Sequence, residues 1–196
     1  MTATTKKTKT KTVKAKVTPI PKLPAIPFAF EVLDAASKQR TKARKIEVLQ
    51  RYPHDSIMAL LIWNFDETVI SLLPEGDVPY GNTREDNSAT GTLSDKINDA
   101  VSKMSEMDST SLGAQDQGKA SIRKEYTKFY NFLKGGNDGL NSLRRETMFI
   151  NILEGLHPLE AEILILVKDK KLSDKYKITK EIASAAYPQI TWGGRS

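Results

Sequence analysis

Cysteine is absent from this sequence, histidine occurs only twice, and no long apolar run is present. Without cysteine the chain can form no disulfide and offers no thiolate for catalysis or metal binding, which fits a reducing compartment. No stretch approaches the 18 apolar residues of a membrane-spanning helix, so we expect no membrane partner. The N-terminus is basic but lacks the apolar core of a secretory signal, and we expect none there.

The two histidines, His54 and His157, each stand beside a proline. A zinc or iron site needs more ligands at matched spacing, so each histidine is better explained as the start of a helix. The sequence also lacks a Gly-Lys-Ser/Thr phosphate loop, a Gly-x-Ser-x-Gly elbow and a dinucleotide-binding fingerprint. We therefore expect that the protein is not an enzyme and has no catalytic residue, metal or cofactor.

Two further patterns permit chemistry but have simpler explanations. The turn 135–139 leads into a helix whose free N–H groups could hold an anion with help from Arg144 and Arg145, but a capped turn explains it without a ligand. A cluster of carboxylates could bind a metal, although helix-dipole and solvated-face roles account for it more simply. These carboxylates are Glu154, Glu160 and Glu162.

Acidic residues are absent from the first 22 positions, which contain seven lysines. The lysines are Lys6, Lys7, Lys9, Lys11, Lys14, Lys16 and Lys22. Removing these 7 from the 30 Lys and Arg leaves 23 against 24 Asp and Glu, so the net charge of +6 belongs to the tail. Closely spaced lysines neutralise phosphates in a salt-sensitive manner, and we expect the tail to contact nucleic acid. A solubilising, disordered tail is the alternative.

A proline-rich spacer, TPIPKLPAIP (18–27), follows this Lys/Thr-rich stretch. The stretch before it has no apolar period and should be disordered alone, and the prolines favour an extended linker. Ile20, Leu23 and Ile26 recur at every third position, so the spacer alternatively lies along an apolar groove.

Helical periodicity dominates the remaining chain and predicts an all-α fold, a compact multi-helix domain over 28–196. We divide this domain into an N-terminal helical part (28–81), a polar loop (82–120) and a central helical core with a C-terminal tail (121–196). Within the polar loop a short helix is expected from four apolar residues at helical spacing, namely Leu93, Ile97, Val101 and Met104.

The densest apolar pattern lies in the first part of the central core. A helix over 126–133 should stop at Gly135-Gly136, and Asn137 or Asp138 should cap the next helix, which ends at Gly155. The apolar stripe of this second helix comprises Leu140, Leu143, Thr147, Ile150 and Glu154, widened by Met148, Ile152 and Leu153.

A third helix should begin at Pro158, because a first-turn proline has no N–H to lose. It is apolar nearly all round and should be the most buried helix. A buried strand over 163–167 is the alternative, which the position of Pro158 and the charge order disfavour. Thr179 should cap a last helix, which Pro188 stops.

In the N-terminal part, Thr41 is expected to cap a helix, Asp55 or Ser56 another, and Asp66 a further turn over 69–73. A basic cluster precedes and opens the Thr41-capped helix, consisting of Lys38, Arg40, Lys42, Arg44 and Lys45. A solvated helix face and a contact with nucleic acid or an acidic partner both explain this cluster.

Whole segments of the chain are similar to one family. They are AASKQRTKARKIEVLQRY (35–52), LIWNF (61–65), LPEGDVPYG (73–81), FLKGGNDGLNSLRRETMFINILEGLHPLEAEI (132–163), VKDKKL (167–172) and AYPQITWGG (186–194). They resemble an uncharacterised family carried by T4-like tailed phages, particularly those of marine cyanobacteria. The resemblance implies a phage-encoded protein in the infected bacterial cytoplasm or in the virion, and it carries over no catalytic residue.

Two functional hypotheses follow. In the first, the protein is a non-catalytic phage accessory protein whose helical domain binds a phage or host protein and whose lysine tail contacts DNA or RNA. Secondary contacts would come from Arg40, Lys42, Arg44, Lys45, Arg144 and Arg145. In the second, it is a virion or assembly component whose N-terminal arm docks on a neighbouring subunit.

Overall fold

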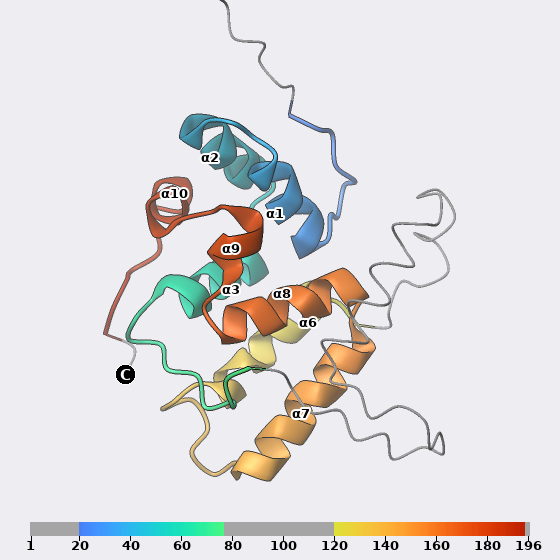
Figure 1. Cartoon of the computed structure of the whole chain (residues 1–196), viewed down its shortest axis with the longest axis vertical. Helices are drawn as coiled ribbons and strands as arrows, with labels where there is room; N and C mark the ends of the chain where they lie inside the picture. The colour runs from blue at the N-terminus through green and yellow to red at the C-terminus, as the bar shows by residue number, and fades with distance from the viewer. Residues whose placement is uncertain (1–19, 77–119, 195–196) are drawn as a thin grey trace, which may run out of the picture.

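Helix α8 (Pro158–Lys168) lies at the centre of the fold, where α1, α3, α7 and α9 pack against it (Figure 1). The computed structural model describes residues 20–76 and 120–194, and these ranges contain eight α-helices and one 3₁₀ helix. The prediction of an all-α fold is confirmed for this part of the chain. The first six tail lysines and the short helix expected around residues 93–104 lie outside the described residues.

The sequence of α8 explains both its ends. His157 caps the helix, because its Nδ1 atom accepts a hydrogen bond from the backbone N–H of Leu159 (3.2 Å), and Pro158 follows in the first turn. At the other end Lys170 adopts a left-handed conformation (φ 58°), and the Lys171 N–H donates to the Leu166 carbonyl at 2.8 Å. The helical prediction for 163–167 is confirmed, and the strand alternative is wrong.

The N-terminal part forms three successive helices, α1 (Ala29–Ser37), α2 (Lys42–Arg51) and α3 (Asp55–Phe65). Thr41 caps α2 as predicted, but the cap of α3 is His54 rather than Asp55 or Ser56. The imidazole Nδ1 atom accepts from the Ser56 N–H at 3.0 Å, so the histidine takes the role expected of a shorter polar side chain.

The helical turn predicted over 69–73 does not form. Asp66 instead turns the chain, and residues 70–72 run extended beside Leu133 in a bridge with Ser71. The Leu72 N–H donates to the Phe132 carbonyl at 2.8 Å, and the Lys134 N–H donates to the Ile70 carbonyl at 3.0 Å. These main-chain bonds replace the helical ones that the apolar spacing suggested.

The helix predicted over 126–133 begins earlier and is tighter than expected. It comprises a short α6 (Ile122–Glu125) and a 3₁₀ helix, η1 (Tyr126–Phe132). Three residues per turn rotate Phe129 and Phe132 into the core, whereas Tyr130 is 53% exposed. Gly135 then takes a φ of 77°, and Gly136 leaves no room for a Cβ, which would lie 1.9 Å from the Tyr130 carbonyl oxygen.

Helix α7 (Ser142–Gly155) follows this turn and ends as predicted at Gly155. Its cap is Asn141, whose Oδ1 atom accepts from the Arg144 N–H at 2.8 Å, and not Asn137 or Asp138. Ile152 and Leu153 of the widened stripe are buried, together with Arg145 and Phe149. Leu143, Thr147 and Glu154 of the predicted stripe are instead exposed.

Two short helices complete the fold, α9 (Leu172–Tyr176) and α10 (Lys180–Ala186). The sequence predicted α10 after Thr179 but gave no sign of α9. Beyond α10 the chain returns to α3, where the Gly193 N–H donates to the Asp66 carboxylate at 2.9 Å. The C-terminal segment is therefore attached to the domain.

A cluster of aromatic rings lies in the core where α3, η1 and α7 meet. Trp63 stacks on Phe132 (6.2 Å between centroids) and meets Phe129 edge-on, and Phe132 in turn packs against Phe149. Burying rings of this size contributes about 1.5–3 kcal/mol each. Within the described ranges, every helix is too short or too polar to cross a membrane.

Glu160 joins three helix N-termini. Its carboxylate is fully buried and accepts from the backbone N–H groups of Ala29 in α1 (3.1 Å) and Ile122 in α6 (2.9 Å). Burial raises the pKa of the carboxyl group, while those two hydrogen bonds and the nearby Arg123 oppose the shift. The expected first-turn position of Glu160 is confirmed, whereas the solvated role is corrected to an interior one.

Candidate nucleic-acid interface

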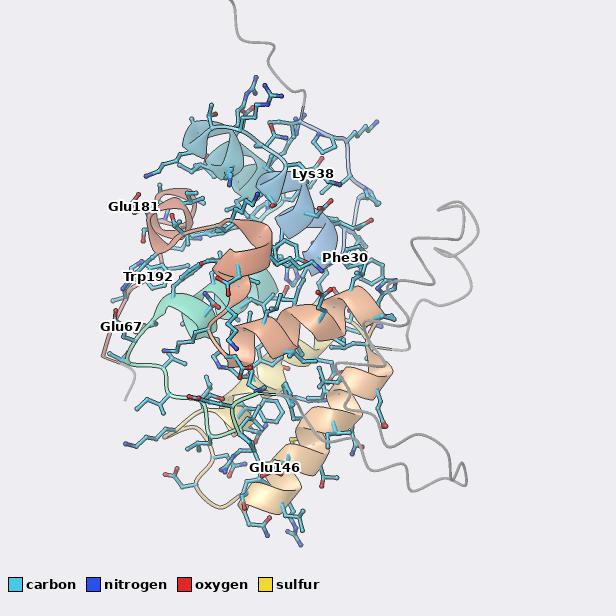
Figure 2. The ribbon with its side chains drawn as sticks, viewed as in Figure 1. Phe30, Lys38, Glu67, Glu146, Glu181 and Trp192 are labelled. Carbon is cyan, nitrogen blue, oxygen red and sulfur yellow. The ribbon has the colours of Figure 1, made fainter. Side chains whose placement is uncertain are left out.

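The candidate interface is the α2 basic surface, which we define as the exposed or half-exposed basic side chains between positions 38 and 51. Its members are Lys38, Arg40, Lys42, Arg44, Lys45 and Arg51. The same interval contains one acidic residue, Glu47. The surface lies at one end of the molecule, and Figure 2 shows Lys38 on one side of α2 and Glu181 on the other.

Local folding places these side chains together. The Thr41 hydroxyl accepts from the Arg44 N–H (3.3 Å) and so fixes the start of α2 directly after Arg40. Val48 and Leu49 are buried against the rest of the domain, which turns the polar side of the helix outward. Arg44 and Arg51 are seven residues apart and therefore share a face of this helix.

Several of the predicted contacts are already paired inside the chain. Lys42 forms an ion pair with Glu181 of α10, and Arg44 forms one with Glu47 (2.7 Å). Lys45 donates to the Lys177 carbonyl at 2.6 Å. All of these pairs are at least partly exposed, so they are weak and are exchanged readily for contacts with another charged group.

At this surface two side chains have shifted pKa values and two arginines have no ion-pair partner among the described residues. Partial burial, and then repulsion by Lys177, lower the pKa of Lys45. The hydrogen bond from Lys42 lowers the pKa of the Glu181 carboxyl group. Among the described residues, Arg40 and Arg51 have no ion-pair partner, so their charges face solvent unopposed.

The root of the lysine tail lies beside α2. Tyr52 follows Arg51 directly, and its hydroxyl accepts from the Leu23 N–H (3.1 Å) and donates to the Pro21 carbonyl (3.3 Å). Figure 1 shows the spacer running along the outside of α1, with its first described residues at the α2 end. Lys22, the one tail lysine inside the described ranges, is exposed there.

The spacer is therefore bound to the domain along part of its length. Ile20 and Leu23 pack against the core, Pro27 is buried, and the Pro27 carbonyl accepts from the Arg123 side chain at 2.8 Å. Ile26 is 75% exposed and does not join them. The interpretation of the spacer as lying along an apolar surface therefore applies to Ile20 and Leu23 but not to Ile26.

The structure does not bring Arg144 and Arg145 to the α2 basic surface. Both lie on α7, at the opposite end of the molecule (Figure 1). Arg145 is buried, and its guanidinium donates to the carbonyls of Asn131 (2.8 Å), Asn137 (3.1 Å) and Leu140 (2.9 Å). This corrects Arg145 from a candidate surface contact to a residue that shapes the turn before α7.

The turn 135–139 offers little to an anion, because the Asn141 side chain caps the helix that follows. The three carboxylates of the sequence pattern are also separated. Glu160 is interior, Glu162 pairs with Lys175, and Glu154 is exposed on α7. In the described part of the chain, no group of three histidine, aspartate or glutamate side chains could hold a metal ion.

A surface hollow of about 300 Å³ lies beside the Ser71 bridge and contains a buried ion pair that the sequence did not reveal. Lys168 pairs with Asp169 and also donates to the carbonyls of Pro74 (2.7 Å) and Gly76 (2.9 Å). The charges lining this hollow are thus used to hold the chain at 74–76.

Sequence reasoning missed one member of the α2 basic surface, Arg51. Its seven-residue spacing from Arg44 was the signal that could have found it.

Comparison with known proteins gives a family but no activity. The chain matches no curated protein and no solved structure. The model of a family of unknown function, DUF6433, matches residues 32–107 and 108–174, together more than half of the chain. The matched stretches contain α2 and its basic surface as well as the buried carboxylate of Glu160. The protein therefore belongs to DUF6433, an uncharacterised family.

Proposed function

We propose that the protein is a non-catalytic phage accessory protein that binds the phosphate backbone of DNA or RNA through the α2 basic surface and the lysine tail. The observation that carries this proposal is the position at which the lysine tail joins the domain, residues 21–23. Tyr52 holds Pro21 and Leu23 at the end of α2, next to Arg51, so the lysine-rich part of the chain joins the domain beside the α2 basic surface.

Charge and length support this proposal. Positions 38–51 hold six basic residues and one acidic residue, and the 22 residues at the N-terminus hold seven lysines and no acid. Helix α2 is about 15 Å long, and over such a length duplex DNA carries roughly nine phosphate charges. Contacts of this kind depend steeply on salt and little on base sequence, because they replace condensed counterions.

The test is a salt titration of binding to a duplex and to a single strand of random sequence. Deleting residues 2–18 should lower the affinity strongly and flatten the slope of log K against log salt. The pair Arg40→Ala and Arg51→Ala should lower both further, since neither side chain forms an ion pair with another described residue.

The matched control is the pair Lys124→Ala and Lys134→Ala, which removes two exposed lysines outside the α2 basic surface. This pair should leave the salt slope unchanged. Equal binding by the intact and the tail-deleted protein would refute the role of the tail, and equal effects of the two double substitutions would refute the role of α2.

The second candidate is a virion or assembly component whose arm docks on a neighbouring subunit in the particle. The observation that favours it is Ile26, an apolar side chain in the spacer that is 75% exposed. Mass spectrometry of purified particles tests this candidate directly. Absence from the particle would remove it, and Ile26→Asp should abolish incorporation if the arm docks through this side chain.

A further inference from the structure

Helix α7 carries two faces with apolar residues, and the domain uses one of them. Phe149, Ile152 and Leu153 point inward and are buried. The stripe that the sequence marked most clearly points the other way, with Leu143 73% exposed and Ile150 only half-buried. Within the described ranges, α7 contacts α8 and η1, and its outer face has no helix against it.

Between these two apolar residues stands Thr147, at the centre of the outer face. Its hydroxyl donates to the Leu143 carbonyl one turn back, at 2.8 Å. The hydroxyl is therefore already satisfied within the helix and needs no water or outside partner. The outer face thus offers a short stripe, Leu143, Thr147 and Ile150, that can be covered without leaving a polar group unpaired.

Opposite charges stand at the two ends of the exposed side of α7, Glu154 in line with the stripe and Arg144 beside it. Arg144 lies in the first turn and Glu154 in the last, and both are exposed. This order is the reverse of the one that the helix dipole favours, which places acids first and bases last, as α8 does with Glu160 and Lys168.

No ion pair within residues 20–76 and 120–194 compensates the reversed order. The first turn of α2 is also basic, but Lys42 and Arg44 find Glu181 and Glu47 as partners. Among the described residues, Arg144 and Glu154 have no ion-pair partner. A helix whose basic end and acidic end are both unpaired is complementary to a copy of itself running in the opposite direction.

We propose that the outer face of α7 binds α7 of a second copy of this chain in an antiparallel arrangement. A twofold axis at the middle of the helix brings Arg144 of each copy to the level of Glu154 of the other. The two ion pairs lie about 15 Å apart, with Thr147 and Ile150 of both copies between them and each Leu143 just outside the pair that its own Arg144 forms. Each charged side chain then also lies beside the favourable end of the neighbouring helix dipole.

Charge exchange tests this arrangement. Sedimentation velocity of the full chain over a range of concentrations should show a dimer of the unmodified protein. Arg144→Glu alone and Glu154→Arg alone should each raise the dissociation constant by about tenfold or more, because each places like charges together at both ends. The doubly exchanged variant, R144E with E154R, should dimerise again.

The decisive sample is an equimolar mixture of the two single variants. In a mixed dimer, position 144 of each variant faces position 154 of the other, and opposite charges meet at both ends. The mixture should therefore dimerise more tightly than either variant does alone. Lys124→Glu and Glu67→Lys, exposed charge reversals on other segments, are the controls and should leave self-association unchanged. Circular dichroism verifies that each variant is folded.

Three results would overturn the proposal. The first is a monomeric protein at every soluble concentration. The second is a dimer that neither single exchange weakens, since its interface would then lie elsewhere. The third is a mixture of the single variants that stays monomeric, which would show that Arg144 and Glu154 do not face each other across the interface.

Discussion

The Tyr187 hydroxyl donates a 3.0 Å hydrogen bond to the backbone carbonyl of Leu49, across 138 residues of sequence. In an α-helix that carbonyl would accept from the residue four positions later, which here is Pro53 and has no N–H. The Tyr187 hydroxyl therefore replaces the backbone N–H donor that is missing at the end of α2. Burial accordingly raises the pKa of Tyr187 well above its usual range.

Replacing Tyr187 by phenylalanine should destabilise the protein by about 1–2 kcal/mol, because the ring stays while a buried carbonyl loses its partner. Urea denaturation measures the change. Tyr130→Phe is the matched control, since that ring is 53% exposed and its substitution should cost far less. Equal costs for the two substitutions would show that the carbonyl finds another donor.

Glu160→Gln should destabilise the fold by about 2–3 kcal/mol in urea denaturation, because an amide has one acceptor atom where the carboxylate has two, and its NH₂ group would face a backbone N–H. Glu162→Gln is the control, since Glu162 pairs with Lys175 on a partly exposed face. Its effect should stay within about 1 kcal/mol.

Glu160 also predicts a pH dependence. Its folded-state pKa is raised above the ordinary value of 4.5, so the folded protein binds this proton more tightly than the unfolded chain. Its contribution is fully present below pH 4.5 and is lost as the pH rises through the folded pKa. The stability of the unmodified protein relative to Glu160→Gln should therefore increase on acidification, and a constant difference would contradict the raised pKa.

His54 should act in the opposite direction. Burial and the nearby Arg123 lower its pKa below 6.5, and its Nδ1 atom caps α3 only as an acceptor. Its stabilising contribution is present above pH 6.5 and is lost as the pH falls through the lowered folded pKa. His54→Asn keeps an acceptor that does not titrate, so it should remove part of the stability loss under mild acid. An NMR titration of the His54 ring with a midpoint at or above 6.5 would count against this account.

Local signals in the sequence located several helices well. Pro158 and the charge order of the following turns identify α8, and the hydroxyl of Thr41 identifies the start of α2, because capping depends on residues within one turn. The same reasoning failed for η1. Tyr126, Phe129 and Tyr130 suit an α-helix by spacing, but packing around Trp63 favours the tighter 3₁₀ winding.

The sequence could not show which residues that are distant along the chain come into contact in the fold. The burial of Glu160 depends on the N–H groups of Ala29 and Ile122, which are 131 and 38 residues away in sequence. The choice between the two faces of α7 likewise depends on which neighbours are present, since both faces have helical periodicity. At the α2 basic surface most of the residues were found from sequence, whereas the tail root beside Tyr52 was visible only in three dimensions.

The two ends of α8 also set a length for the chain between residues 76 and 122. Lys168 and Asp169 hold Gly76 at one end, and Glu160 holds Ile122 at the other. The helix keeps these attachment points about 12 Å apart. Any shortened version of the intervening segment must bridge that span, which takes about four extended residues at the least. A series of shortened connectors should therefore show a loss of stability once the connector falls below the length that α8 sets.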